Sequence, residues 1–189
     1  MYLKEVKKRY PSSKNIFFGP CCSLFPDQII CEKSIDFVIT AEPEEAIEGI
    51  ITKKNMPEIP NICYQNENGI VLNDEKGLDL KTIDYHIEYS IYLAFLRKHN
   101  LKSPAFLFFE ISRGCIYDCF FCSLLSHKTL RHKDIDFAFN ELKTIVKKTK
   151  INNIFFTDNE LNFSNDYLEK FLDLIINTSL YSFSENIYH

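Results

Sequence analysis

Residues 105–122 read AFLFFEISRGCIYDCFFC, an apolar run followed by three closely spaced cysteines. The apolar part, residues 105–111, predicts a buried β-strand, and residues 112–114 predict a turn directly after it. The cysteines then follow with the spacing Cys-x3-Cys-x2-Cys at Cys115, Cys119 and Cys122. Three thiolates on one short loop can each bind one iron of a 4Fe–4S cluster, which leaves the fourth iron without a protein ligand.

Two other uses of these cysteines stay open at this point. Free cysteine packs as a small hydrophobe, so the three thiols could simply be buried. Two thiolates and two imidazoles could also form a tetrahedral structural zinc site. The residues with that spacing are Cys119, Cys122, His127 and His132. The zinc site would leave Cys115 unused and would not explain the strand that precedes the loop.

The composition is that of a globular protein without a nucleic-acid or membrane partner. The 189 residues are 46% hydrophobic and carry a net charge of −4, so no broad basic face is expected. No apolar run approaches the roughly 20 residues that a membrane helix needs. The seven cysteines and the polar N-terminus, with no secretory signal, favour a reducing cytoplasm.

The N-terminal part alternates strands with helices. Residues 15–18 and 36–40 predict strands, and residues 42–51 predict a helix whose first turn is acidic. This order favours parallel pairing of the strands. From residue 53 to about 84 the periodicity is lost, although residues 62–64 and 70–72 predict a small hairpin.

The C-terminal part repeats the alternation. Residues 82–98 predict a helix, and the strand at 105–111 and the cysteine loop come next. Helices are then expected at 134–148 and 166–176, on either side of a strand at 153–157. We expect the strands at 105–111 and 153–157 to be parallel neighbours that are joined through the first of these helices.

The segment from Ser112 to Cys122 resembles the cluster loop of the radical S-adenosylmethionine (radical SAM) superfamily, including the aromatic Phe121 before the last cysteine. The resemblance implies that Cys115, Cys119 and Cys122 bind a 4Fe–4S cluster. The open iron would bind S-adenosylmethionine, which is cleaved reductively to a 5′-deoxyadenosyl radical. In this family the second strand often ends in an acidic segment that contacts the amino group of the bound methionine portion.

Further cofactor and partner expectations follow from this resemblance. Asp158 and Glu160 would accept the ammonium group, and Phe121 would flank the adenine. The electron donor would be a flavodoxin or a ferredoxin, and the substrate would be an unknown small molecule or peptide. Relatives of this kind transfer methyl groups or modify peptides and metabolites.

The N-terminal part resembles the last strands of the Rossmann-like cobalamin-binding domain. The resemblance rests on Gly19-Pro20-Cys21 after the first strand and on residues 36–44. Glycines of the family pattern are replaced at Phe18, Ala41 and Pro43, and the cobalt-ligand motif Asp-x-His-x-x-Gly is absent. The earlier strands of the family domain have no counterpart in this sequence, and half a domain offers no convincing pocket for a corrin. Cobalamin is therefore expected only if the missing half of that domain is supplied.

These resemblances give one expected architecture of the α/β class. Residues 1–55 would be a remnant of a Rossmann-like (flavodoxin-like) domain, and residues 56–101 a linker with a hairpin and a helix. Residues 102–189 would be the first βα units of a partial radical SAM barrel. Because the chain resembles one truncated at both ends, whether it is an active enzyme stays open. The alternatives are a non-catalytic iron–sulfur-binding fragment and a small zinc-binding module.

Overall fold

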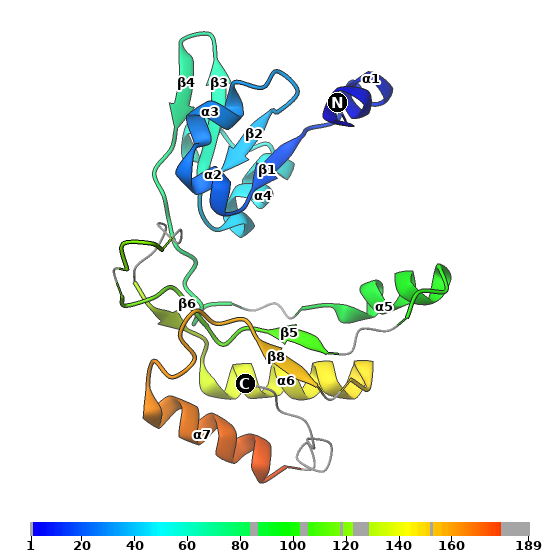
Figure 1. Cartoon of the computed structure of the whole chain (residues 1–189), viewed down its shortest axis with the longest axis vertical. Coiled ribbons are helices and arrows are strands. Elements are labelled where there is room, and N and C mark those ends of the chain that lie inside the picture. Colours follow the sequence, from blue (N-terminus) through cyan, green and yellow to red (C-terminus); the bar gives the residue numbers. More distant parts are fainter. Residues whose placement is uncertain are drawn as a thin grey trace. The chain divides into compact units, whose positions relative to one another are not determined.

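The computed structural model of the chain describes residues 2–83, 87–102, 106–117, 119–122, 129–151 and 153–178 (Figure 1). The chain divides into two compact units. The first comprises residues 1–78 and 116–128, and the second comprises residues 79–115 and 129–189. Each unit combines helices with a pair of parallel strands, so the α/β class predicted from the sequence is confirmed.

The first unit is built on a sheet with the strand order β1-β2-β3-β4 in its described residues. The strands are β1 (Ile16–Phe18), β2 (Phe37–Ile39), β3 (Ile62–Asn66) and β4 (Gly69–Leu72). β1 and β2 are parallel, as the alternation of strands and helices predicted. β3 is antiparallel to both β2 and β4.

The predicted hairpin is present, but assigning it to a linker was wrong. Val38 of β2 pairs with Cys63 of β3, and Ile39 pairs with Ile62, so the hairpin extends the sheet of the first unit. That unit therefore continues to residue 78 rather than ending near residue 55. The pattern of a hairpin predicts its own turn but does not say which strand its outer edge will pair with.

Helices cover both faces of this sheet. The helices of the first unit are α1 (Tyr2–Arg9), α2 (Pro20–Leu24), α3 (Pro26–Ile30), α4 (Pro43–Ile51) and the short 3-10 helix η1 (Met56–Glu58), of which α3 and α4 cover opposite faces. Successive residues of a strand point to opposite faces. Val38 accordingly packs with Ile30 of α3, whereas its neighbours Phe37 and Ile39 pack with Ala46 of α4. Burial of β2 on both faces explains its unbroken apolar sequence.

The second unit has its own parallel pair of strands. Its elements are α5 (Tyr89–Lys98), β5 (Leu107–Phe109), β6 (Ser112–Arg113), β7 (Arg131–His132), α6 (Ile135–Thr149), β8 (Ile154–Phe156) and α7 (Asn165–Ile176). β5 and β8 are parallel neighbours, with Phe108 opposite Phe155, and α6 lies between them in the chain. The predicted strand–helix–strand unit is confirmed.

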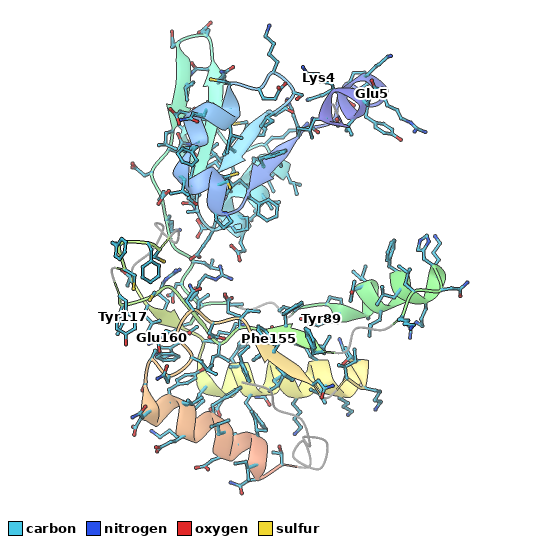
Figure 2. The ribbon with its side chains drawn as sticks, viewed as in Figure 1. Lys4, Glu5, Tyr89, Tyr117, Phe155 and Glu160 are labelled. Atoms are coloured by element: carbon cyan, nitrogen blue, oxygen red, sulfur yellow. The ribbon has the colours of Figure 1, made fainter. Side chains whose placement is uncertain are left out.

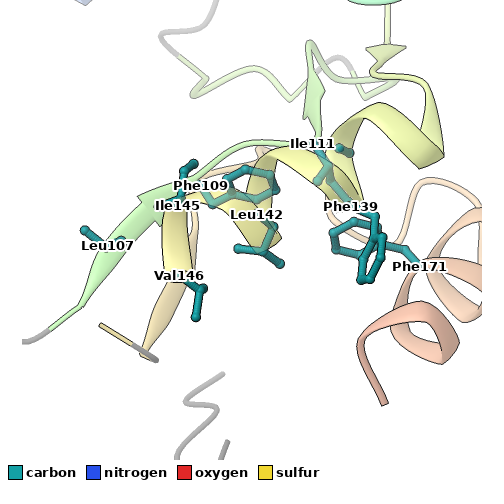
Figure 3. Packing of buried hydrophobic residues seen from close by; sticks show 9 residues of the cluster. Leu107, Phe109, Ile111, Phe139, Leu142, Ile145, Val146 and Phe171 are labelled. Atoms are coloured by element: carbon teal, nitrogen blue, oxygen red, sulfur yellow. The ribbon is translucent and has the colours of Figure 1, made fainter. Parts of the chain in front are cut away.

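The core of the second unit lies between this strand pair and helices α6 and α7. Figure 3 shows Phe109 of β5 beside Leu142 and Ile145 of α6, and Phe139 beside Phe171 of α7. Leu107, Ile111, Ala138 and Val146 complete the buried cluster.

Local signals fix where helix α6 begins and ends. The Asp134 side chain caps the helix by accepting hydrogen bonds from the N–H groups of Asp136 (3.0 Å) and Phe137 (3.1 Å). At the other end Lys150 adopts a left-handed conformation (φ 60°), which stops the helix before the chain turns into β8. These caps place the end of β8 next to the end of β5.

Candidate functional site

The three predicted cluster ligands lie on a loop whose two ends are side by side. We call residues 114–130 the cluster loop. On its two sides β6 and β7 pair antiparallel, with Ser112 opposite His132 and Arg113 opposite Arg131. The Lys133 N–H also donates a hydrogen bond of 2.9 Å to the Ile111 carbonyl. The ends of the loop are therefore joined just beyond the carboxyl end of β5.

The three thiols are distributed over both units. Cys115 belongs to the second unit and is half-buried, whereas Cys119 (exposed) and Cys122 (half-buried) belong to the first. The Cys122 N–H donates a 3.0 Å hydrogen bond to the Cys119 carbonyl, which forms a turn between these two cysteines. No three His, Cys, Asp or Glu side chains of the described residues are grouped closely enough to hold a metal ion.

The remaining cysteines all lie in the first unit. Cys22 and Cys63 are buried beside Ile30 and Val38, and burial is the main cause that raises the pKa of both thiols above 9.0. A raised pKa disfavours the thiolate, the form that binds metal. Cys21 and Cys31 are exposed. The two buried thiols therefore act as core residues.

Asp158 lies directly beyond β8 and holds the start of the cluster-loop region. Its carboxylate accepts a hydrogen bond from the Ile111 N–H at 3.1 Å and from the Ser112 hydroxyl at 2.7 Å, and it also accepts one from the Ser112 N–H. Burial raises the pKa of Asp158, although these hydrogen bonds oppose the shift. The carboxylate thus contacts the protein's own backbone, and its expected contact with S-adenosylmethionine stays a prediction.

Glu160 differs from Asp158 although it is only two residues away. Its backbone carbonyl accepts a hydrogen bond of 3.5 Å from the Ser112 hydroxyl, and its side chain is half-buried (Figure 2). Within the described residues the Glu160 carboxylate has no hydrogen bond or ion pair. Of the two predicted ammonium acceptors, Glu160 is therefore the one whose carboxylate is open to a ligand.

Phe121 is not a core residue. Its side chain is 77% exposed and meets Phe120 edge-to-face, with 5.3 Å between the ring centroids. An aromatic ring on an exposed loop is free to stack on a planar ligand. Its predicted contact with the adenine is compatible with this exposure and stays a prediction.

A buried ion pair next to the cluster loop was not predicted from the sequence. Lys133 Nζ lies 2.7 Å from Glu141 Oε2, and only 6% and 1% of these side chains are exposed. The sequence did contain a signal, because Glu141 falls on the apolar stripe of α6 between Ala138 and Ile145. A charged residue on such a stripe indicates a buried partner.

The zinc alternative finds little support in the surroundings of His132. Its ring stacks on Phe163 (5.4 Å between centroids, 17°) and meets the Tyr167 ring at 4.9 Å. His132 Nδ1 lies 3.0 Å from the Lys133 carbonyl. His127 lies outside the described residues.

Comparison with known proteins identifies this fold. No family model matches the chain. A Methanocaldococcus jannaschii protein that carries the name methylthiotransferase is 24% identical over 144 residues, which cover 75% of this chain and 29% of that protein. The cobalamin-dependent S-adenosylmethionine radical enzyme OxsB, solved with aqua-cobalamin and S-adenosylmethionine bound, superposes with a TM-score of 0.73 at 19% identity. That match covers 98% of this chain and 26% of OxsB.

A second enzyme of the same class gives a similar match. The radical S-adenosylmethionine methyltransferase TsrM from Kitasatospora setae, solved with cobalamin and a [4Fe-4S] cluster bound, has a TM-score of 0.67 at 14% identity. The match covers 93% of this chain and 37% of TsrM. The chain thus shares its fold with part of these two cobalamin-dependent radical SAM enzymes. The chain spans well under half the length of each protein that it matches.

Two further observations concern cobalamin and membranes. The sequence has no histidine among residues 1–78, so that segment supplies no imidazole ligand for cobalt. Near the end of β2, Glu42 accepts a 2.7 Å hydrogen bond from the Leu78 N–H, and Asn61 donates one of 2.9 Å to the Glu42 carbonyl. None of the helices in the described residues is long and apolar enough to cross a membrane.

Proposed function

We propose that this chain is a radical SAM protein that binds a 4Fe–4S cluster through Cys115, Cys119 and Cys122. The observation that carries the proposal is the Cys-x3-Cys-x2-Cys loop, whose ends are joined beyond the carboxyl end of a parallel strand. Active sites of βα barrels lie at this end of the strands. The fold shared with OxsB and TsrM supports the same assignment.

The donor set fits the cluster in its chemistry. Cys115, Cys119 and Cys122 stand close together in the sequence, so one loop can supply a thiolate ligand to each of three irons. Because the described residues do not bring three ligands together, we propose that the thiolates gather around the iron as it binds. When bound, the cluster supplies the electron for reductive cleavage of S-adenosylmethionine.

The residues of the chain would position S-adenosylmethionine. The open Glu160 carboxylate would accept the ammonium group in a charge-assisted hydrogen bond, and the exposed Phe121 ring would cover the adenine. A flavodoxin or ferredoxin would supply electrons in the cytoplasm, and the substrate would be a small molecule or a peptide. Methyl transfer is the first reaction to test, because TsrM is a methyltransferase.

The test is anaerobic reconstitution with ferrous iron and sulfide, followed by dithionite and S-adenosylmethionine. We expect about four irons per chain and release of 5′-deoxyadenosine that depends on reductant. Stoichiometric zinc that survives Cys115→Ala would instead support the zinc module. A bound cluster without any 5′-deoxyadenosine would support a non-catalytic iron–sulfur protein.

A further inference from the structure

Ionisable side chains that are wholly or partly buried lie at both ends of the cluster loop. The chain reaches the loop through Ile111 and Ser112 and leaves it through Lys133. The Lys133 N–H to Ile111 carbonyl hydrogen bond joins these two segments directly. Ionised groups are costly to bury, so those found here must be offset by specific partners.

The first is the half-buried carboxyl group of Asp158. Its Oδ1 atom accepts hydrogen bonds from the Ile111 N–H (3.1 Å), the Ser112 N–H and the Ser112 hydroxyl (2.7 Å). These donors stand only three and four residues before Cys115. The interaction ties the cysteine-bearing segment to the stretch that follows β8 and that also contains Glu160. One carboxylate thereby fixes the distance between the loop and that strand end.

The second is the pair formed by Lys133 and Glu141. Their 2.7 Å contact fastens the segment after the loop to helix α6. The Lys133 ammonium also lies 5.1 Å from the centroid of the Phe109 ring on β5, and the Lys133 carbonyl accepts a hydrogen bond of 3.0 Å from the Tyr167 hydroxyl on α7. The returning end of the loop is therefore held by three separate elements of the second unit.

We propose that these two clamps position the cluster loop for the iron–sulfur cluster, Asp158 at its start and the Lys133–Glu141 pair at its return. This inference rests on the proposed function. Asp158 acts as a positioning residue that contacts the backbone of the loop rather than the ligand. Fixing both ends in advance reduces the ordering cost that the loop incurs when its thiolates gather around iron.

The first experiment uses the metal-free chain and needs no cluster. Asp158→Asn keeps the size of the side chain but removes its charge, and Ser112→Ala removes only the hydroxyl donor. We expect amide hydrogen exchange at Ile111 and Ser112 to accelerate strongly in Asp158→Asn and less in Ser112→Ala. Asp166→Asn, at an exposed aspartate of α7, should leave both amides unchanged. Equal exchange in the wild type and Asp158→Asn would overturn the start clamp.

The second experiment measures the cluster. We expect Asp158→Asn to bind the reconstituted cluster about 10- to 100-fold more weakly in chelator competition, the range seen when supporting residues of metal sites are removed. The double variant Lys133→Met/Glu141→Leu removes the return clamp without leaving a buried charge unpaired. It should weaken the cluster in the same sense and alter the electron paramagnetic resonance signal of its reduced form.

The outcomes separate the inference from the proposed function. Variants that remain folded, as judged by urea unfolding, and yet hold the cluster with wild-type affinity and signal would overturn the clamps while leaving the function intact. A folded wild-type chain that takes up no cluster would overturn the proposed function, and with it the role of the clamps in iron binding. Weaker clusters in the clamp variants, with a normal cluster in Asp166→Asn, would support the inference.

Discussion

Two carboxylates that follow β8 differ in role because their local environments differ. Asp158 and Glu160 stand two positions apart, and no sequence pattern distinguishes their roles. In the structure the Asp158 carboxylate is occupied by Ile111 and Ser112, whereas that of Glu160 has no hydrogen bond or ion pair among the described residues. The difference depends on which side chain reaches the neighbouring loop, which no local pattern encodes.

Glu160 should therefore affect ligand binding without affecting the cluster. We expect Glu160→Gln to weaken S-adenosylmethionine binding by roughly 10- to 100-fold, because a hydrogen bond to a charged group contributes about 1.5–3 kcal/mol. The iron content should stay at the wild-type level. Isothermal titration of the reconstituted protein measures the effect, and Glu169→Gln on α7 is the control. Unchanged affinity in Glu160→Gln would remove this residue from the site.

Replacing one member of the buried Lys133–Glu141 pair should destabilise the protein more than replacing both. Lys133→Met removes the cation that neutralises the buried Glu141 carboxylate, and we expect it to lower the free energy of unfolding by about 3–5 kcal/mol. The double variant Lys133→Met/Glu141→Leu should lie close to the wild type, because no charge is left without a partner. Urea unfolding gives both values. As a control, Lys170→Met breaks an exposed pair and should cost less than about 0.5 kcal/mol.

Asp36 in the first unit should stabilise the fold more at neutral pH than at acidic pH. Burial opposes ionisation, but hydrogen bonds from Lys7 (2.6 Å) and the Asn15 N–H (2.8 Å) hold the pKa of Asp36 below 3.8. Such a group contributes stability above its unfolded pKa, and the contribution is lost as the pH falls through the lower folded pKa. Asp36→Asn should therefore be less stable at neutral pH and lose less stability between about pH 5 and about pH 2. An unchanged acid dependence would contradict this assignment.

At the level of elements, the sequence predicted most of the regular structure. The helix over 42–51 and the strand over 36–40 matched α4 and β2 within two residues, because caps and apolar periodicity are local signals. β6 and β7 are only two residues long, too short for a periodic pattern, so the pairing that closes the cluster loop could not be predicted. The helix predicted over 82–98 spans Tyr89–Lys98 in the structure.

Helix α4 packs so closely on the residue after η1 that one methyl group should disturb it. A Cβ atom on Gly49 would lie 2.9 Å from both Cγ atoms of Ile59, which is itself fully buried. Gly49→Ala should cost about 1–3 kcal/mol through overpacking, despite the better helix propensity of alanine.

Thermal or urea unfolding tests this prediction. Ile59→Ala removes the obstructing atoms, so a double-mutant cycle should show that the two changes compensate in part. Stabilisation by Gly49→Ala alone would mean that the helix can move away from Ile59.

At the scale of the whole molecule, the fold and the ligand set were predictable for different reasons. The cysteine spacing showed the candidate ligands because cluster ligation requires several thiolates within a short segment. The extent of the first unit was not predictable, because the pairing of β3 with β2 joins segments that are distant in sequence. The gathering of the three thiols stays a prediction, since Cys115 belongs to one unit and Cys119 and Cys122 to the other.

The central claim is that Cys115, Cys119 and Cys122 bind a 4Fe–4S cluster that has an open iron. Its most direct test is the charge-transfer absorbance of the anaerobically reconstituted chain, measured for each of the seven Cys→Ala variants. We predict that the absorbance is lost in each variant of the loop cysteines and is retained in the variants at Cys21, Cys22, Cys31 and Cys63. A loss in Cys63→Ala as severe as that in Cys115→Ala would indicate four thiolate ligands and no open iron, and would contradict the account.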